Sequence, residues 1–303
     1  FIIHRSEFVY WIYSLQSQYF GKCIIFKILI HKQFLMEQKI LIQSVDIIKF
    51  KKNQRTAVMD DVMIEEPLQI NTISKDLGKK PSSITMRTPG HDDELALGFM
   101  FNEGIINEAR DIVKTTVGDG EVNLYFNDHI STDTKDTERN FYITSSCGVC
   151  GKSSIDALKM HSEPKKVNKL FSPEIIKSMY EEIRLNQKSF VLTGGSHSAA
   201  VFNYKGKLIV LREDVGRHNA VDKCAGYLFK NGLLASDEYI LCLSGRSCYE
   251  LIQKAVRMNC TTIISIGAAT SLAIETAFQF NVTLIGFFKD TGYNIYNGQE
   301  RQI

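Results

Sequence analysis

The second half of the chain alternates between short apolar runs and amphipathic segments, and this alternation limits the fold more than any other feature. Helical periodicity predicts helices over about residues 217–230, 247–258 and 270–279. Runs rich in β-branched and aromatic residues predict strands over residues 189–193, 200–203, 207–212, 239–244, 262–266 and 282–287. Strands interleaved with helices are typical of an α/β domain with a largely parallel sheet.

The first half of the chain has a different order of elements. Extended segments are predicted over residues 39–50 and 62–73, a helix from residue 92, and a hairpin over residues 112–126. A further helix is predicted over residues 173–186. We therefore expect a smaller α+β region over residues 36–150, a helical connection, and an α/β domain over residues 151–303.

Residues 1–35 do not fit this organisation. They lack an initiating methionine and contain a single acid, Glu7. We expect Met36 to be the biological start and residues 1–35 to be a non-native or disordered extension.

The composition excludes several classes of protein. The chain has 303 residues, of which 44% are hydrophobic and 23% charged, so it is neither disordered nor fibrous. A net charge of +2 gives no reason to expect a nucleic-acid partner. No apolar run reaches the roughly 18 residues of a membrane span, so we expect no membrane association. The absence of a secretory signal favours a reducing, cytoplasmic location.

A C-x-x-C motif, Cys147-Gly148-Val149-Cys150, is the strongest sign of chemistry in the sequence. Such a pair in a reducing compartment is redox-active, binds a metal or carries sulfur as a persulfide. Zinc needs about four ligands, and there is no second C-x-x-C, so we expect no resident metal. We expect the remaining cysteines to be core residues: Cys23, Cys224, Cys242, Cys248 and Cys260.

Polar and glycine-rich turns follow several of the predicted strands. Ligands of open α/β sheets bind at the carboxyl ends of the strands, and arginines beside helix N-termini bind phosphate. The sequence therefore predicts a pocket for a sizeable anionic ligand, although each turn alone is also consistent with local capping or surface salt bridges. The candidate residues are Gly195, His197, Arg217, His218 and Arg246.

Six ordered segments together resemble the formate dehydrogenase accessory sulfurtransferase family (FdhD/NarQ). They include TPGHDDELALGF, SSCGVCGK, TGGSHSAAVF, REDVGRHNAVDK and LSGRSCYELIQKA. The resemblance implies a C-terminal domain with the three-layer fold of cytidine deaminases, and a homodimer. It implies that sulfur passes from a cysteine desulfurase, as a persulfide, to the molybdenum cofactor in its bis-guanine-dinucleotide form, before insertion into formate dehydrogenase.

The resemblance also assigns site residues. Cys147 carries the persulfide and Cys150 assists or resolves it, while a cofactor-binding segment near the C-terminus corresponds to Phe287, Phe288, Lys289, Asp290, Thr291 and Gly292.

Two other functions remain to be weighed. Zinc deaminases carry H-x-E and P-C-x-x-C, whereas Ala199 stands two residues after His197 and Ser146 precedes the C-x-x-C, so the sequence argues against deamination. A chaperone that binds the molybdenum cofactor without moving sulfur remains open.

Overall fold

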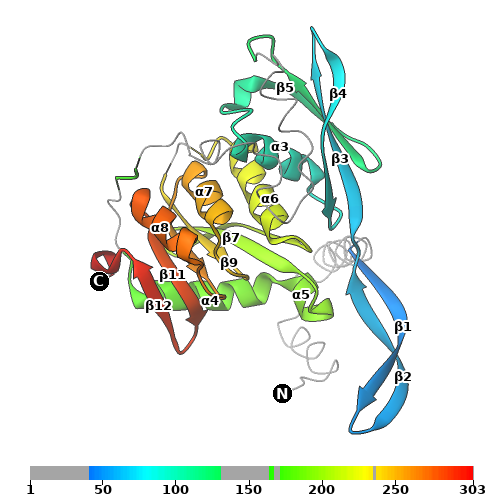
Figure 1. Ribbon diagram of the computed structural model, residues 1–303, viewed down its shortest axis with the longest axis vertical. Helices are drawn as coiled ribbons and strands as arrows, with labels where there is room; N and C mark the ends of the chain where they lie inside the picture. Colours follow the sequence, from blue (N-terminus) through cyan, green and yellow to red (C-terminus); the bar gives the residue numbers. More distant parts are fainter. Residues whose placement is uncertain (1–40, 131–163, 167–170, 235–236, 303) are drawn as a thin grey trace, which may run out of the picture. The chain divides into compact units, whose positions relative to one another are not determined.

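Alternate side chains of a central six-stranded sheet point to opposite faces, and helices cover both faces (Figure 1). The computed structural model describes residues 41–130, 164–166, 171–234 and 237–302. Across the sheet the strands are β12 (Gly292–Asn297), β11 (Thr283–Lys289), β10 (Cys260–Ser265), β9 (Tyr239–Leu243), β7 (His197–Asn203) and β8 (Leu208–Asp214). The α/β prediction for this part of the chain is confirmed.

The strand directions differ from the prediction. Only β9, β10 and β11 run parallel to one another, whereas β7, β8 and β12 pair antiparallel with their neighbours. The connections explain the error: residues 204–207 join β7 to β8, and a two-residue turn joins β11 to β12. A parallel pair needs a crossover of about a dozen residues or more, so these short connections produce hairpins.

The helices form two layers around the sheet. One face carries α6 (Arg217–Lys230), α7 (Tyr249–Arg257) and α8 (Ser271–Gln279). The other face carries α4 (Pro173–Asn186), whose Ile176 and Met179 are fully buried against the strands. This gives the three layers expected from the sequence, while the specific likeness to cytidine deaminases stays a prediction.

A second, four-stranded sheet precedes this layered part in the chain. Its order is β4 (Gly78–Arg87), β3 (Glu66–Ser74), β6 (Glu121–Phe126) and β5 (Ile112–Val117). The β5–β6 hairpin confirms the prediction, and the helix expected from residue 92 is α3 (Asp92–Asn102). A separate hairpin is formed by β1 (Ile42–Lys51) and β2 (Gln54–Met63), and two short 3-10 helices lie at Ala109–Asp111 and Gln299–Arg301.

The two predicted regions share one hydrophobic core. Buried residues of α3 and of the four-stranded sheet, such as Leu95 and Val122, belong to the same cluster as Val221 of α6 and Leu241 of β9. The predicted boundary at residue 150 lies outside the described residues, as does the boundary at residue 35. Among the described residues, no helix combines the length and the apolar character that a bilayer crossing requires.

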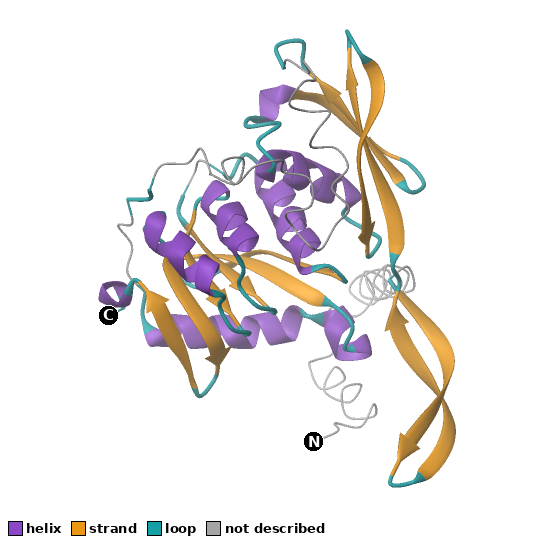
Figure 2. Cartoon of the chain, in the orientation of Figure 1, coloured by secondary structure: helices purple, strands orange, loops and turns teal. Residues whose placement is uncertain are grey.

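One predicted strand is a helix instead. Residues 189–193 lie in α5 (Lys188–Thr193), purple in Figure 2. The Glu213 carboxylate accepts hydrogen bonds from the backbone N–H groups of Ser189 (2.9 Å) and Phe190 (2.8 Å), which satisfies the first turn. The apolar side chains that suggested a buried strand, including Val191 at 73% exposed, lie at the surface.

Helices α3 and α6 cross with their backbones in contact. A Cβ atom built on Gly98 would lie 1.8 Å from the Asp222 carbonyl oxygen, and one built on Gly226 would lie 1.8 Å from the Glu94 carbonyl oxygen. Any larger residue at either position must therefore push the helices apart.

We expect Gly226→Ala to lower the free energy of unfolding by on the order of 3 kcal/mol, because the methyl group overpacks the crossing. In a helix interior without such a contact, replacing glycine by alanine stabilises the fold by about 1 kcal/mol. The sign of the change in the free energy of unfolding therefore tests the contact. Urea unfolding checks it. Gly118→Ala is the control, because its nearest neighbour is the flexible Glu121 side chain at 3.3 Å. A stabilised Gly226→Ala protein would contradict the contact.

Candidate functional site

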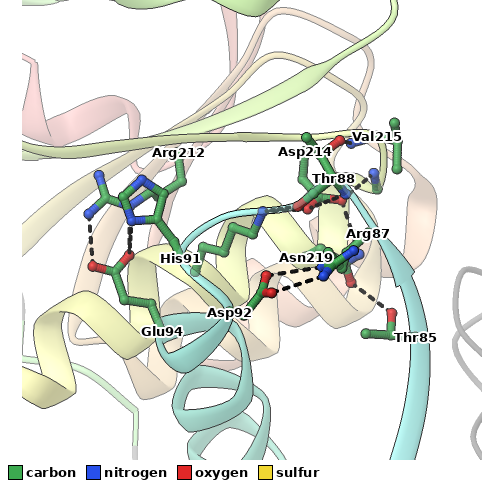
Figure 3. A network of polar contacts seen from close by, with 12 residues as sticks. Thr85, Arg87, Thr88, His91, Asp92, Glu94, Arg212, Asp214, Val215 and Asn219 are labelled. Carbon is green, nitrogen blue, oxygen red and sulfur yellow. Dashed lines mark hydrogen bonds and ion pairs between the residues drawn. The ribbon is translucent and has the colours of Figure 1, made fainter. Parts of the chain in front are cut away.

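A buried ion pair fixes the junction between β8 and α6 (Figure 3). The side chains of Asp214 and Lys223 are 0% and 1% exposed, and Lys223 Nζ lies 2.7 Å from Asp214 Oδ2. Lys223 also donates to the Thr88 carbonyl oxygen (2.8 Å), and Asp214 accepts from the N–H groups of Thr88 (3.2 Å) and Gly216 (2.8 Å). The start of α6 is therefore attached to the segment that precedes α3.

Two bidentate ion pairs extend this attachment. Arg212 donates to both carboxylate oxygens of Glu94, at 2.6 and 2.8 Å, and Arg87 donates to both oxygens of Asp92, at 3.0 and 2.9 Å. Figure 3 shows both pairs on either side of His91. The charges in TPGHDDE and in the first half of REDVGRHNAVDK thus build the fold, as salt bridges in a partly buried network.

The strand ends bring together five residues that we call the strand-end cluster: His197, Arg217, Ser244, Gly245 and Gly267. Because β7 is antiparallel to β8 and β9, its first residue lies at the carboxyl ends of those strands, with His197 opposite Asp214. The Ser244 hydroxyl lies 3.3 Å from His197 Nδ1 and accepts from the Ser198 N–H (2.8 Å).

Glycines let the backbone segments of this edge approach closely. The Gly267 N–H donates to the Gly245 carbonyl (3.1 Å), and the Phe287 N–H donates to the Gly267 carbonyl (3.1 Å). A Cβ atom on Gly267 would lie 2.9 Å from the Arg246 nitrogen, and one on Gly245 would lie 3.3 Å from the His197 ring. The edge is therefore lined by backbone next to an imidazole.

Arg217 is a donor at this edge that the described part of the fold leaves unused. Its Nε atom is buried and has no hydrogen-bond partner within the described part of the chain. The Arg217 side chain lies beside Gly245 and opens α6. An unsatisfied guanidinium nitrogen at a helix N-terminus favours an anionic ligand.

His197 stays neutral near pH 7. Burial, and then the positive charge of Arg217, hold the pKa of this histidine below its ordinary value of 6.5. A neutral imidazole can either donate or accept a hydrogen bond, so it adds polar contact without further positive charge.

A second cluster lies on the first residues of α6 and α7. His218 Nε2 is 2.9 Å from a carboxylate oxygen of Glu250 and 3.6 Å from the Sγ atom of Cys248. Burial opposes both charged forms, but the hydrogen bonds outweigh it, so the pKa of His218 is raised and that of Cys248 is lowered. Both contacts of His218 in this cluster are made by its Nε2 atom.

The other described cysteines differ in how deeply they are buried. Cys224, Cys242 and Cys260 are buried, as expected for core residues, and burial raises the pKa of Cys224 to about 12. Cys248 packs against the core but is only partly buried and contacts His218, so it differs from the three buried cysteines. Cys23 lies outside the described residues.

The remaining predicted site residues are scattered. Gly195 lies beside Met63 of β2, and Arg246 is exposed in the loop after β9. Phe287 is exposed with a left-handed backbone (φ 54°), whereas Phe288 is 1% exposed and packs against Tyr180. The exposed turn of the β11–β12 hairpin holds Lys289, Asp290, Thr291 and Gly292. Cys147 and Cys150 lie outside the described residues.

Comparison with known proteins identifies the family. The model of the FdhD/NarQ family matches residues 63–303. The chain is 41% identical over 261 residues to "Sulfur carrier protein FdhD" of Sulfolobus acidocaldarius, covering 86% of this chain and 98% of the relative. It is 37% identical over 272 residues to the protein of the same name from Streptomyces coelicolor, covering 84% and 93%.

The chain belongs to the FdhD/NarQ family. The crystal structure of "a putative formate dehydrogenase accessory protein" from Desulfotalea psychrophila has the same fold, with a TM-score of 0.71 at 23% identity over 87% of this chain and 100% of that one. The resemblance found in the sequence segments is therefore confirmed at the level of family and α/β fold.

The sequence did not indicate that Ser244 contacts His197, or that Cys248 and Glu250 contact His218. Ser244 and Glu250 belong to the recognisable segment LSGRSCYE, but their partners His197 and His218 are more than 30 positions away. Only the fold shows these pairs.

We expect His197 to titrate below pH 6.5, and Arg217→Gln to raise its pKa by removing a neighbouring positive charge. In the unsubstituted protein the folded state binds a proton at His197 less tightly than the unfolded chain does. Protonation of His197 therefore lowers the free energy of unfolding as the pH falls below about 6.5. Titration of the histidine Cε1–H resonances by NMR measures the pKa. Arg246→Gln serves as control, and a His197 pKa at or above 6.5 in the unsubstituted protein would refute the assignment.

Proposed function

We propose that this protein is a sulfur carrier that delivers sulfur to the molybdenum cofactor, in its bis-guanine-dinucleotide form, for formate dehydrogenase. The support is membership of a family whose curated relatives are named sulfur carrier proteins, together with a C-x-x-C at Cys147 and Cys150. The proposal includes a cytoplasmic homodimer that receives its sulfur from a cysteine desulfurase.

Loading is a thiol–persulfide exchange. The Cys147 thiolate attacks the outer sulfur of the desulfurase persulfide, the S–S bond breaks, and the desulfurase cysteine leaves as a thiolate. Cys147 then holds the sulfur as a persulfide. No net oxidation occurs, because one S–S bond replaces another.

Delivery uses the second cysteine. The Cys150 thiolate attacks the inner sulfur of the Cys147 persulfide, which forms a Cys147–Cys150 disulfide and releases the outer sulfur as sulfide. Two thiols are oxidised by two electrons and the sulfane sulfur is reduced by two, so the step balances. The sulfide becomes a ligand of the molybdenum, and a cellular dithiol reductant restores the C-x-x-C.

The strand-end cluster supports the substrate class. The unpaired Nε atom of Arg217 is the observation that carries this part of the proposal, since a diphosphate would supply the missing acceptor. His197 and the backbone around Gly245 and Gly267 would surround the same group, and Arg246 and the turn at residues 287–292 lie on segments that leave this edge.

The second candidate is a chaperone that binds the cofactor without moving sulfur. The observation that favours it is that the strand-end cluster offers an anionic cofactor Arg217 and His197, neither of which is a thiol. Under this alternative, maturation of formate dehydrogenase does not need Cys147 and Cys150, but it does need the strand-end cluster.

Incubation with a cysteine desulfurase and cysteine should add one sulfur to the peptide that contains Cys147, removable by reductant and detectable by mass spectrometry. We expect Cys147→Ser to abolish this gain, whereas Cys248→Ser, which also removes an accessible thiol, should retain it. If an active desulfurase adds no sulfur to the unsubstituted protein, the sulfur carrier is excluded and the chaperone is favoured.

Arg217→Gln should weaken binding of guanosine diphosphate roughly tenfold or more, because it removes a charged hydrogen bond to phosphate. Isothermal titration calorimetry gives the affinities. Arg184→Gln on α4, on the opposite face of the sheet, removes the same charge as a control. Equal affinities of the Arg217→Gln and unsubstituted proteins would remove Arg217 from the site.

A further inference from the structure

We propose that His218, Cys248 and Glu250 bind one zinc ion, a site that goes beyond the sulfur carrier function and does not rest on it. The three side chains lie on the first residues of α6 and α7, which cover the same face of the sheet. Their ligand atoms all lie within 4.8 Å of one another. All three residues are partly exposed, so an ion can reach them.

The carboxylate and the thiol of the cluster meet at one ring nitrogen of the histidine. Both the Glu250 oxygen (2.9 Å) and the Cys248 sulfur (3.6 Å) contact the same nitrogen, Nε2 of His218. In a cysteine–histidine relay the acid holds one ring nitrogen and the thiol contacts the other. Here the carboxylate and the sulfur contact the same ring nitrogen, which is not the arrangement of such a relay. A metal ion in place of a proton on that nitrogen satisfies all three groups.

The separations and donor types fit zinc. Thiolate, imidazole and carboxylate are the side-chain ligands that zinc takes in proteins. Tetrahedral zinc, with bonds of about 2.3 Å to sulfur and about 2.0 Å to nitrogen, places these two atoms about 3.5 Å apart. The observed separation between Cys248 Sγ and His218 Nε2 is 3.6 Å. The Glu250 oxygen, 2.9 Å from the same nitrogen, must move outward by a few tenths of an ångström, since bonds of about 2.0 Å place oxygen and nitrogen about 3.3 Å apart.

The charges around the cluster also permit a cation. A thiolate and a carboxylate balance the two positive charges of zinc. Lys254, a helix cation whose charge acts on His218, is held by both carboxylate oxygens of Asp222, at 2.6 and 2.5 Å, which compensates its charge. Asp222 shares a face of α6 with His218, as their spacing of four residues predicts.

Three protein ligands leave a fourth position for water or a substrate atom, as in zinc sites that perform chemistry. The cluster lies near His197 of the strand-end cluster, because the charge of His218 acts on that histidine. The H-x-E of zinc deaminases has no counterpart here, because Ala220 stands two residues after His218. The ion is therefore placed to hold a ligand near the strand-end cluster rather than to deaminate.

Metal titration tests the site, using the full chain with Cys147→Ser and Cys150→Ser so that the C-x-x-C cannot bind metal. We expect one equivalent of zinc, measured by competition with a chromophoric chelator. Cobalt substituted for zinc should give a sulfur-to-metal charge-transfer band in the near ultraviolet. Since these readouts do not involve sulfur transfer, a failure of either proposal leaves the other intact.

In this background Cys248→Ser should lower the zinc affinity at least about tenfold and abolish the charge-transfer band, and Glu250→Gln should lower the affinity without abolishing the band. His197→Gln, a histidine outside the ligand set, should change neither. Circular dichroism establishes that the variants fold. An absence of stoichiometric zinc binding, or an unchanged cobalt spectrum in Cys248→Ser, would overturn the proposal.

Discussion

The described part of the molecule depends on the buried pair of Asp214 and Lys223. Neither charge has access to water, so each needs the other, and removing one partner of such a pair costs about 3–5 kcal/mol. The hydrogen bonds of Asp214 to the N–H groups of Thr88 and Gly216 join three parts of the chain. The register of β7 against β8 then places His197 opposite Asp214. The position of the candidate site therefore follows from an interaction that takes no part in its chemistry.

Local patterns predicted the elements whose signals are local. Helix α6 has the predicted bounds, 217–230, because its periodicity and the glycine before it are contained in the sequence around it. Helix α5 was predicted as a strand because its cap is Glu213, 24 residues away. Strand β4 was not predicted because it inverts the usual pattern, burying Thr85 and Arg87 and exposing Ile84 and Met86. Strand β12 was not predicted either, because it has only six residues, of which two are asparagines.

The sequence predicted individually His197 and Arg217, which the structure brings together beside Gly245, but also Gly195, which lies beside Met63. The run from Arg212 to Lys223 concentrates charge at a strand-to-helix junction, which drew attention to the right place. Its members separate in the structure: Arg212 and Asp214 have partners within the fold, whereas Arg217 keeps an unused donor. Sequence spacing cannot make this separation, because the partners Glu94 and Thr88 lie more than 110 residues away.

Three consecutive residues at the end of β8 each hold a different element: Arg212 holds α3 through Glu94, Glu213 holds the first turn of α5, and Asp214 holds the start of α6. Although β8 is the edge strand of its sheet, its end cannot open without releasing two helices and the loop before a third. Fraying, which is ordinary at sheet edges, is therefore coupled here to cooperative unfolding of a much larger unit. The rim of the candidate site is in this sense one of the most rigid parts of the fold, and it presents a ligand with donors that are already in place.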